Sequence, residues 1–76
     1  SYFMRQVKKN AARKYLNDAI NLDKKNPEYW RVKIQTETEM NPKDELYLED
    51  IYQNALKATS NHIDIVTIYA QFLSKF

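Results

Sequence analysis

The side chains that could do acid–base or metal chemistry are few, and their spacing works against it. The single histidine, His62, has Asp64 two residues further on, so on a helix the two would point to different sides. Glu37 and Glu39 diverge for the same reason. The chain has no cysteine, which excludes a thiolate metal site. We therefore expect no enzyme activity, no metal and no cofactor, and we expect His62 to serve in a turn or a helix cap.

A second group of acidic residues follows the turn around Pro42. Its four members fall at what we expect to be the first turns of a helix, where negative charge favours the helix dipole: Asp44, Glu45, Glu49 and Asp50. We interpret them as helix-stabilising residues. The absence of glycine also excludes a glycine-rich phosphate-binding loop.

The basic residues are unevenly distributed. Residues 1–25 carry seven Lys or Arg against two acids, whereas residues 26–76 carry five against eight, although the net charge is only +2. Three interpretations stay open: a solvated helix face, a patch that binds RNA or another anion, and a surface for an acidic protein. The candidate RNA or anion contacts are Arg5, Lys8, Lys9 and Arg13.

The elements that would position these residues are helices. Glycine is absent and there are two prolines, which argues against hairpins and sandwiches because their turns need glycine. Apolar residues recur at helical period between polar breaks, and Asn26-Pro27 suits the start of a helix. No apolar run is long enough to span a membrane. We predict one all-α unit over residues 1–76, with antiparallel helices at about 3–23, 27–40, 45–59 and 62–76.

The apolar stripes of these helices give a predicted core. Six Tyr, three Phe and one Trp could stack on bases, but most of them lie on the stripes. The predicted core residues are Tyr15, Ala19, Trp30, Tyr52, Ala55, Tyr69 and Phe72. Tyr2, Phe3 and Phe76 lie at the ends, where we expect them to pack against neighbouring repeats or to promote self-association.

The first and second halves of the sequence correspond with an offset of 36 residues. Ala19 maps onto Ala55, and Gln35 maps onto Gln71. The polar breaks and the small residues match as well as the stripes, which is typical of helical pairs stacked in an α-solenoid. A plain four-helix bundle with two similar hairpins is the alternative.

The segment ARKYLNDAINLDKKNPEYW, residues 12–30, is similar to the second helix of a half-a-tetratricopeptide (HAT) repeat followed by the first helix of the next repeat. It resembles the ends of the family's A-R-x-I-Y-x-x-A-L pattern and its N-P-x-x-W junction. The second copy resembles I-Y-x-x-A-L and Y-A-x-F-E at residues 51–56 and 69–73. Ordinary tetratricopeptide repeats usually show a Leu-Gly pair, and this chain has no glycine, which favours HAT.

The sequence departs from the HAT pattern at four places. The aromatic residue of the first copy, Tyr15, comes one position early. The second copy has Val66 where the family has Trp, Leu73 where an acid is usual, and Glu49 where the first copy has Arg13.

The resemblance implies a protein-interaction scaffold of a nuclear RNA-processing complex, acting in pre-rRNA processing, splicing or 3′-end processing. Residues 33–76 look most like the C-terminal part of the U3 small-nucleolar-RNA-associated protein family, which implies a nucleolar location and a fragment of a longer array. The expected partners are other proteins of such a complex, through a concave face that includes Arg31, Gln35 and Gln71. HAT arrays also dimerise, so a homodimer fits as well. The alternatives are direct RNA binding through the basic first helix and a cytosolic tetratricopeptide-type co-chaperone that binds peptides.

Overall fold

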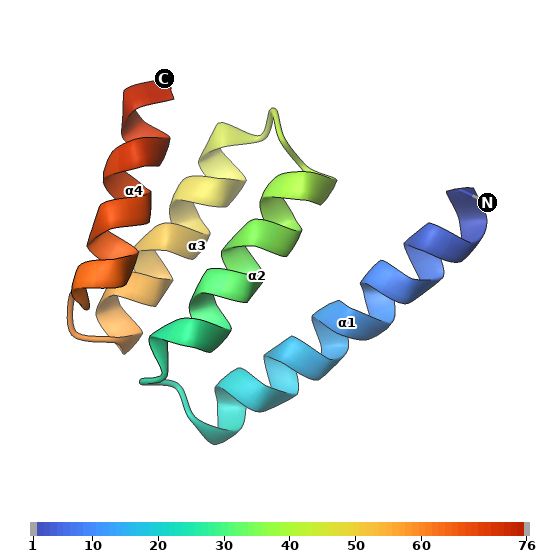
Figure 1. The fold of residues 1–76 in the computed structure, drawn as a ribbon, viewed down its shortest axis with the longest axis horizontal. Helices are drawn as coiled ribbons and strands as arrows, with labels where there is room; N and C mark the ends of the chain where they lie inside the picture. Colours follow the sequence, from blue (N-terminus) through green and yellow to red (C-terminus); the bar gives the residue numbers. More distant parts are fainter. Residues whose placement is uncertain (1, 76) are drawn as a thin grey trace.

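The protein is all-helical in the part of the chain that the structure describes. This computed structural model describes residues 2–75, and the side chains of residues 3–75. Its helices are α1 (Tyr2–Leu22), α2 (Pro27–Met40), α3 (Glu45–Ala58) and α4 (Ile63–Lys75) (Figure 1). The predicted all-α class is confirmed, and each helix begins and ends within one residue of the position expected from the sequence. No helix over the described residues is long and apolar enough to cross a membrane.

Local hydrogen bonds define where the helices begin and end. Asn26 caps α2, because its Oδ1 accepts a hydrogen bond from the N–H of Glu28 at 3.0 Å, and Pro27 occupies the first turn. Asp44 caps α3 in the same way, accepting from the N–H of Tyr47 at 3.2 Å. Polar residues directly before α2 and α3 thus fix where these two helices begin.

The turn after α3 uses left-handed backbone without glycine. Ser60 and Asn61 have φ values of 56° and 60°. The N–H of Asn61 reaches back to the carbonyl of Leu56 at 2.8 Å and satisfies one of the last carbonyls of the helix. Non-glycine residues occupy this region at a cost in free energy, so the turn is held by its hydrogen bonds.

Helices α2, α3 and α4 lie side by side, and α1 packs on α2 through its C-terminal half while its N-terminal half projects away (Figure 1). Trp30 of α2 anchors the first turn, because its Nε1–H donates to the carbonyl of Lys24 at 2.8 Å. The buried apolar cluster spans all four helices and consists of Ile20, Trp30, Ile34, Leu48, Ile51, Tyr52, Ala55, Ile65 and Phe72. Burial of these side chains is the main source of stability in a chain of this size.

The turns of the two hairpins, α1–α2 and α3–α4, begin and end at the same positions once they are offset by 36 residues. Ala58, which ends α3, lies 36 residues after Leu22, which ends α1. Ile63, which begins α4, lies 36 residues after Pro27, which begins α2. The two hairpins therefore share one turn length and one helix register.

Equivalent residues in the two hairpins also make equivalent hydrogen bonds. Lys33 Nζ of α2 donates to Asn17 Oδ1 of α1 at 3.0 Å. The residues 36 positions later, Tyr69 and Gln53, are also hydrogen-bonded, but here Gln53 Nε2 donates to the hydroxyl of Tyr69 at 2.9 Å. His62 Nδ1 accepts from the N–H of Asp64 at 3.1 Å, which repeats the cap that Asn26 gives to α2. The correspondence found in the sequence therefore extends to specific contacts.

The predicted core is wrong at Tyr15, whose side chain is 76% exposed. Among the described residues α1 packs on α2 through the face that carries Leu16 and Ile20, and it reaches α3 through a hydrogen bond from Arg13 to Tyr47. Tyr15 lies on the neighbouring face, which no other helix covers, and Ala19 between the two is half-buried. Of the other predicted core residues, Tyr69 is half-buried against the cluster and the remaining four are buried: Trp30, Tyr52, Ala55 and Phe72.

Of the three aromatic residues at the chain ends, the structure describes the side chain of one. The side chain of Phe3 is exposed, near the start of the projecting half of α1. The side chain of Tyr2 and all of Phe76 lie outside the described residues.

Candidate protein-interaction groove

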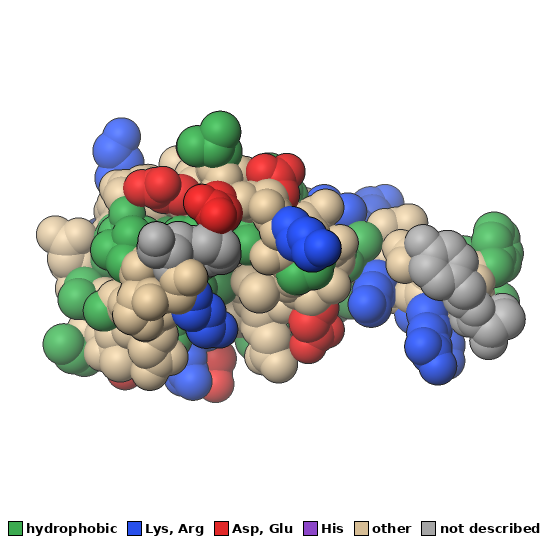
Figure 2. Space-filling model, turned by 90° about the horizontal axis from the view of Figure 1, so that it is seen from above, with side chains coloured by type: hydrophobic (Ala, Val, Ile, Leu, Met, Phe, Trp, Pro, Cys, Tyr) green, Lys and Arg blue, Asp and Glu red, His purple; other side chains and the backbone are tan. Residues whose placement is uncertain are grey.

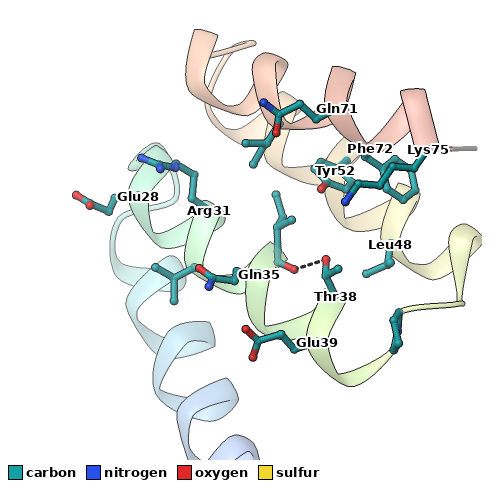
Figure 3. Close-up of a pocket in the computed structure, with 14 residues that line it drawn as sticks. Glu28, Arg31, Gln35, Thr38, Glu39, Leu48, Tyr52, Gln71, Phe72 and Lys75 are labelled. Atoms are coloured by element: carbon teal, nitrogen blue, oxygen red, sulfur yellow. Dashed lines mark hydrogen bonds between the residues drawn. The ribbon is translucent and has the colours of Figure 1, made fainter.

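A groove of about 540 Å³ runs between α2 and α4, and α3 forms its floor (Figure 3). One wall comes from α2, with Arg31 and Gln35, and the other from α4, with Gln71 and Lys75. Pro42, in the turn between α2 and α3, also lines it. Because α2 and α4 are parallel neighbours on the same side of α3, the groove follows directly from the order of the helices.

The floor of the groove is apolar and well packed. Leu48 and Tyr52 lie one helical turn apart on α3, so both reach the same side, and Phe72 of α4 packs beside them. The rings of Tyr52 and Phe72 have centroids 4.8 Å apart, and those of Tyr52 and Tyr69 are 5.3 Å apart. Aromatic rings at these separations stabilise one another, so the floor is a preformed surface for an apolar side chain.

Tyr52 gives this floor one polar group. Its side chain is 6% exposed, and its hydroxyl makes no hydrogen bond to any residue that the structure describes. Burial raises the pKa of Tyr52, because the charged phenolate would be poorly solvated. The hydroxyl therefore stays protonated, and it can donate a hydrogen bond to a carbonyl oxygen of a bound segment.

The rim of the groove is polar and mixed in charge. The two negative residues, Glu28 and Glu39, balance the two positive residues, Arg31 and Lys75, so the lining residues give the groove no net charge. The amides of Gln35 and Gln71 are exposed, and the two residues are equivalent under the 36-residue offset. An apolar floor with a polar rim of no net charge suits a peptide segment better than a phosphate or another strongly charged ligand.

The structure brings together the three residues predicted for the concave face. Arg31, Gln35 and Gln71 all line the groove and surround its opening (Figure 3). Sequence reasoning assigned Tyr52 and Phe72 to the core and did not identify them as the floor of the groove. A buried residue and a groove-floor residue have the same type and spacing, so only the relative placement of α2 and α4 distinguishes them.

The four basic candidates on α1 are not equivalent. Arg5 and Lys8 are exposed and Lys9 is half-buried, all on the part of α1 that projects from the other helices. Figure 2 shows Lys and Arg side chains and no Asp or Glu at this end of the view, whereas side chains of both signs lie over the rest of the molecule. Arg13 is instead engaged in an ion pair with Glu37.

The Arg13–Glu37 pair joins α1 to α2. Arg13 Nε donates to Glu37 Oε1 at 2.8 Å, and Arg13 Nη2 donates to the hydroxyl of Tyr47 at 3.4 Å. Glu37 is 3% exposed, and its Oε2 has no hydrogen-bond partner among the described residues. Burial alone would lower the pKa of Arg13, but the hydrogen bond and charge of Glu37 raise it. The structure thus assigns Arg13 an interhelix contact in place of a free surface position.

His62 and Asp64, which were considered for a metal site, form a helix cap. His62 Nδ1 lies 3.9 Å from Asp64 Oδ2 and already accepts the capping hydrogen bond from the backbone of α4. Over residues 2–75, no three His, Asp or Glu side chains converge so that they could hold a metal ion. Neither a protein-family model, nor a curated protein, nor a solved structure matches this chain.

Proposed function

We propose that this chain is a non-enzymatic protein-interaction scaffold built from HAT-like helical repeats, and that it binds a peptide or helical segment of a partner protein in the α2–α4 groove. The groove is the observation that carries the proposal. It offers a packed apolar floor at Leu48, Tyr52 and Phe72, with a hydroxyl that has no partner among the described residues. A partner would place one apolar side chain on this floor and a backbone carbonyl at Tyr52.

The repeat correspondence supports a solenoid arrangement within this proposal. The helix ends beside the turn, the turn length, one cap and one hydrogen-bonded interhelix pair recur after 36 residues. Helical-pair repeats of about this length stack so that one helix of each pair lines a concave binding surface. In this chain α2 and α4 are the helices in that position.

A nuclear, and specifically nucleolar, RNA-processing assembly is the setting that we propose for this scaffold. This part rests on the resemblance of the sequence to HAT repeats and to the U3 small-nucleolar-RNA-associated family. The mixed charge of the groove favours it over the cytosolic co-chaperone alternative, because capture of an acidic peptide tail would call for a cluster of basic residues, and Arg31 and Lys75 are offset by Glu28 and Glu39.

The test is an affinity capture from nuclear and cytosolic extracts, with and without nuclease, using the wild-type chain and two variants. Gln71→Trp fills the groove from an exposed position, and Lys57→Trp places the same side chain on the far side of α3 as a control. We expect nuclear RNA-processing proteins to survive nuclease treatment and to be lost with Gln71→Trp only. Equal recovery with both variants would exclude the groove, and recovery of chaperones alone would favour the co-chaperone function.

Direct RNA binding is a second candidate, because Arg5, Lys8 and Lys9 share the projecting half of α1. Phosphate contacts release counterions, so this function predicts that RNA affinity falls steeply with salt. Titration of a fluorescent single-stranded RNA at low and physiological ionic strength measures it. Affinity that is absent at low salt, or that is unchanged when the three residues are replaced by glutamine, would eliminate this candidate.

A further inference from the structure

The two outer helices of the fold each expose an apolar stripe away from the groove. On α4 the stripe consists of Ile63, Val66, Ala70 and Leu73, which recur at helical spacing and are all exposed. On α1 the corresponding stripe consists of Ala12, Tyr15, Ala19 and Leu22, of which only Ala19 is half-buried. Exposed apolar surface arranged along a whole helix face is typical of an interaction surface.

The 36-residue correspondence pairs each exposed stripe with a set of residues that is mostly buried inside the fold. The stripe of α4 is equivalent to Pro27, Trp30, Ile34 and Glu37 of α2, the last three of which are buried. The stripe of α1 is equivalent to Leu48, Ile51, Ala55 and Ala58 of α3, the first three of which are buried. Because α2 packs on α3, the centre of the fold already contains a contact between these two kinds of stripe.

We propose that a second copy of this chain docks its α1 stripe onto the α4 stripe of the first, repeating the α2–α3 contact between molecules. A second copy is the occupant that the structure itself supplies, since one chain carries both halves of the contact at opposite ends. Leu73 takes the place of the buried Glu37, so the intermolecular contact buries an apolar side chain there and no charge. Head-to-tail contacts of this type are heterologous, so they propagate beyond a dimer.

The charges of α1 and α3 favour the same arrangement. Lys9 and Lys14 of α1 are equivalent to Glu45 and Asp50 of α3, so the sign is reversed at matching positions. In the proposed stack, α4 of one copy is flanked by the acidic α3 of its own chain and by the basic α1 of the next. Opposite charges attract over roughly 8–10 Å at moderate ionic strength, so association should weaken as salt is added.

The test is sedimentation velocity of the whole chain over a concentration series, with Tyr15→Asp and Leu73→Asp as single variants. Both positions are exposed, so neither change should unfold the protein, which circular dichroism verifies. We expect the wild type to form dimers and larger species of the 9.1 kDa chain, and each variant to associate at least tenfold more weakly. A mixture of the two variants retains one intact α4 stripe and one intact α1 stripe, so it should form dimers and nothing larger.

Leu46→Asp is the matched control, because Leu46 is 83% exposed and belongs to neither stripe, and this variant should associate like the wild type. A wild type that stays monomeric up to about 1 mM would overturn the proposal and assign the stripes to a different occupant. So would a mixture that stays monomeric. If Leu73→Asp associates normally while Tyr15→Asp does not, two α1 helices pair with each other and the head-to-tail arrangement is wrong.

Discussion

Replacing Arg13 and replacing Glu37 should have very different effects on the free energy of unfolding. Arg13→Met removes the donor that lies 2.8 Å from Glu37 Oε1, while Oε2 already has no partner among the described residues. A carboxylate that is 3% exposed would then be buried with neither oxygen bonded. Glu37→Leu removes the buried charge instead, and leaves Arg13 able to contact water and Tyr47.

The magnitudes follow from the burial of the two side chains. Breaking a fully buried ion pair costs about 3–5 kcal/mol, because one charge is left without a partner. The Arg13 side chain is 35% exposed, so water can enter when it is truncated, and we expect Arg13→Met to lower the free energy of unfolding by about 2–4 kcal/mol. Glu37→Leu should change it by less than about 1 kcal/mol, since replacing a buried charge with a well-packed apolar group is often neutral.

Urea unfolding of the two single variants and the double variant, followed by circular dichroism at 222 nm, measures these differences. The double variant should match Glu37→Leu, so the coupling energy should equal the cost of Arg13→Met, about 2–4 kcal/mol. Similar losses from Arg13→Met and Glu37→Leu would refute this account, because they would mean that the carboxylate does not depend on Arg13. A loss below about 0.5 kcal/mol for Arg13→Met, the size of an exposed pair, would refute it equally.

Three further predictions concern other parts of the fold. Burial raises the pKa of Tyr52 above 10.0, so the unfolded chain loses this phenolic proton at a lower pH than the folded chain. The stability that Tyr52 contributes below about pH 10 is therefore lost as the pH rises through the folded-state pKa. Tyr52→Phe should lessen this loss in alkaline urea titrations. Ala55→Leu should overpack the fully buried α3 contact and cost about 1–3 kcal/mol in thermal unfolding, and Ala19→Leu, at the half-buried equivalent, should cost less. Ser60→Gly should raise the melting temperature by relieving left-handed backbone at φ 56°, a gain of roughly 0.5–1 kcal/mol, and an unchanged midpoint would count against strain in this turn.

The helices were predictable because residues close to each helix end determine where that helix begins or ends. Asn26-Pro27 and Asp44 supply caps whose hydrogen bonds reach only two or three residues along the chain. The wall residues Gln35 and Gln71 were predictable for a related reason, because the 36-residue offset gives them the same place in two equivalent helices. Where a local signal or an internal repeat was present, the sequence predicted where these residues lie in the fold.

Tyr15 and Arg13 could not be placed in this way. The apolar pattern around Tyr15 is that of a covered helix face, and a pattern on one helix does not reveal whether a neighbouring helix covers it. The partner of Arg13 is 24 residues away on another helix, so its ion pair depends on how α1 and α2 pack. The groove floor has the same origin, since it exists only where α2 and α4 flank α3.

The dependence of the fold on near neighbours also has a consequence for its kinetics. Among the described residues, the helices pack as α1 on α2, α2 on α3 and α4, and α3 on α4, and α1 contributes only Ile20 to the buried cluster. Helical proteins with such local contacts fold in microseconds to milliseconds. The lining of the groove comes entirely from α2, α3, α4 and the turn at Pro42. The groove can therefore persist through the undocking and redocking of α1, so the lifetime of a bound partner need not be limited by the exchange of that helix.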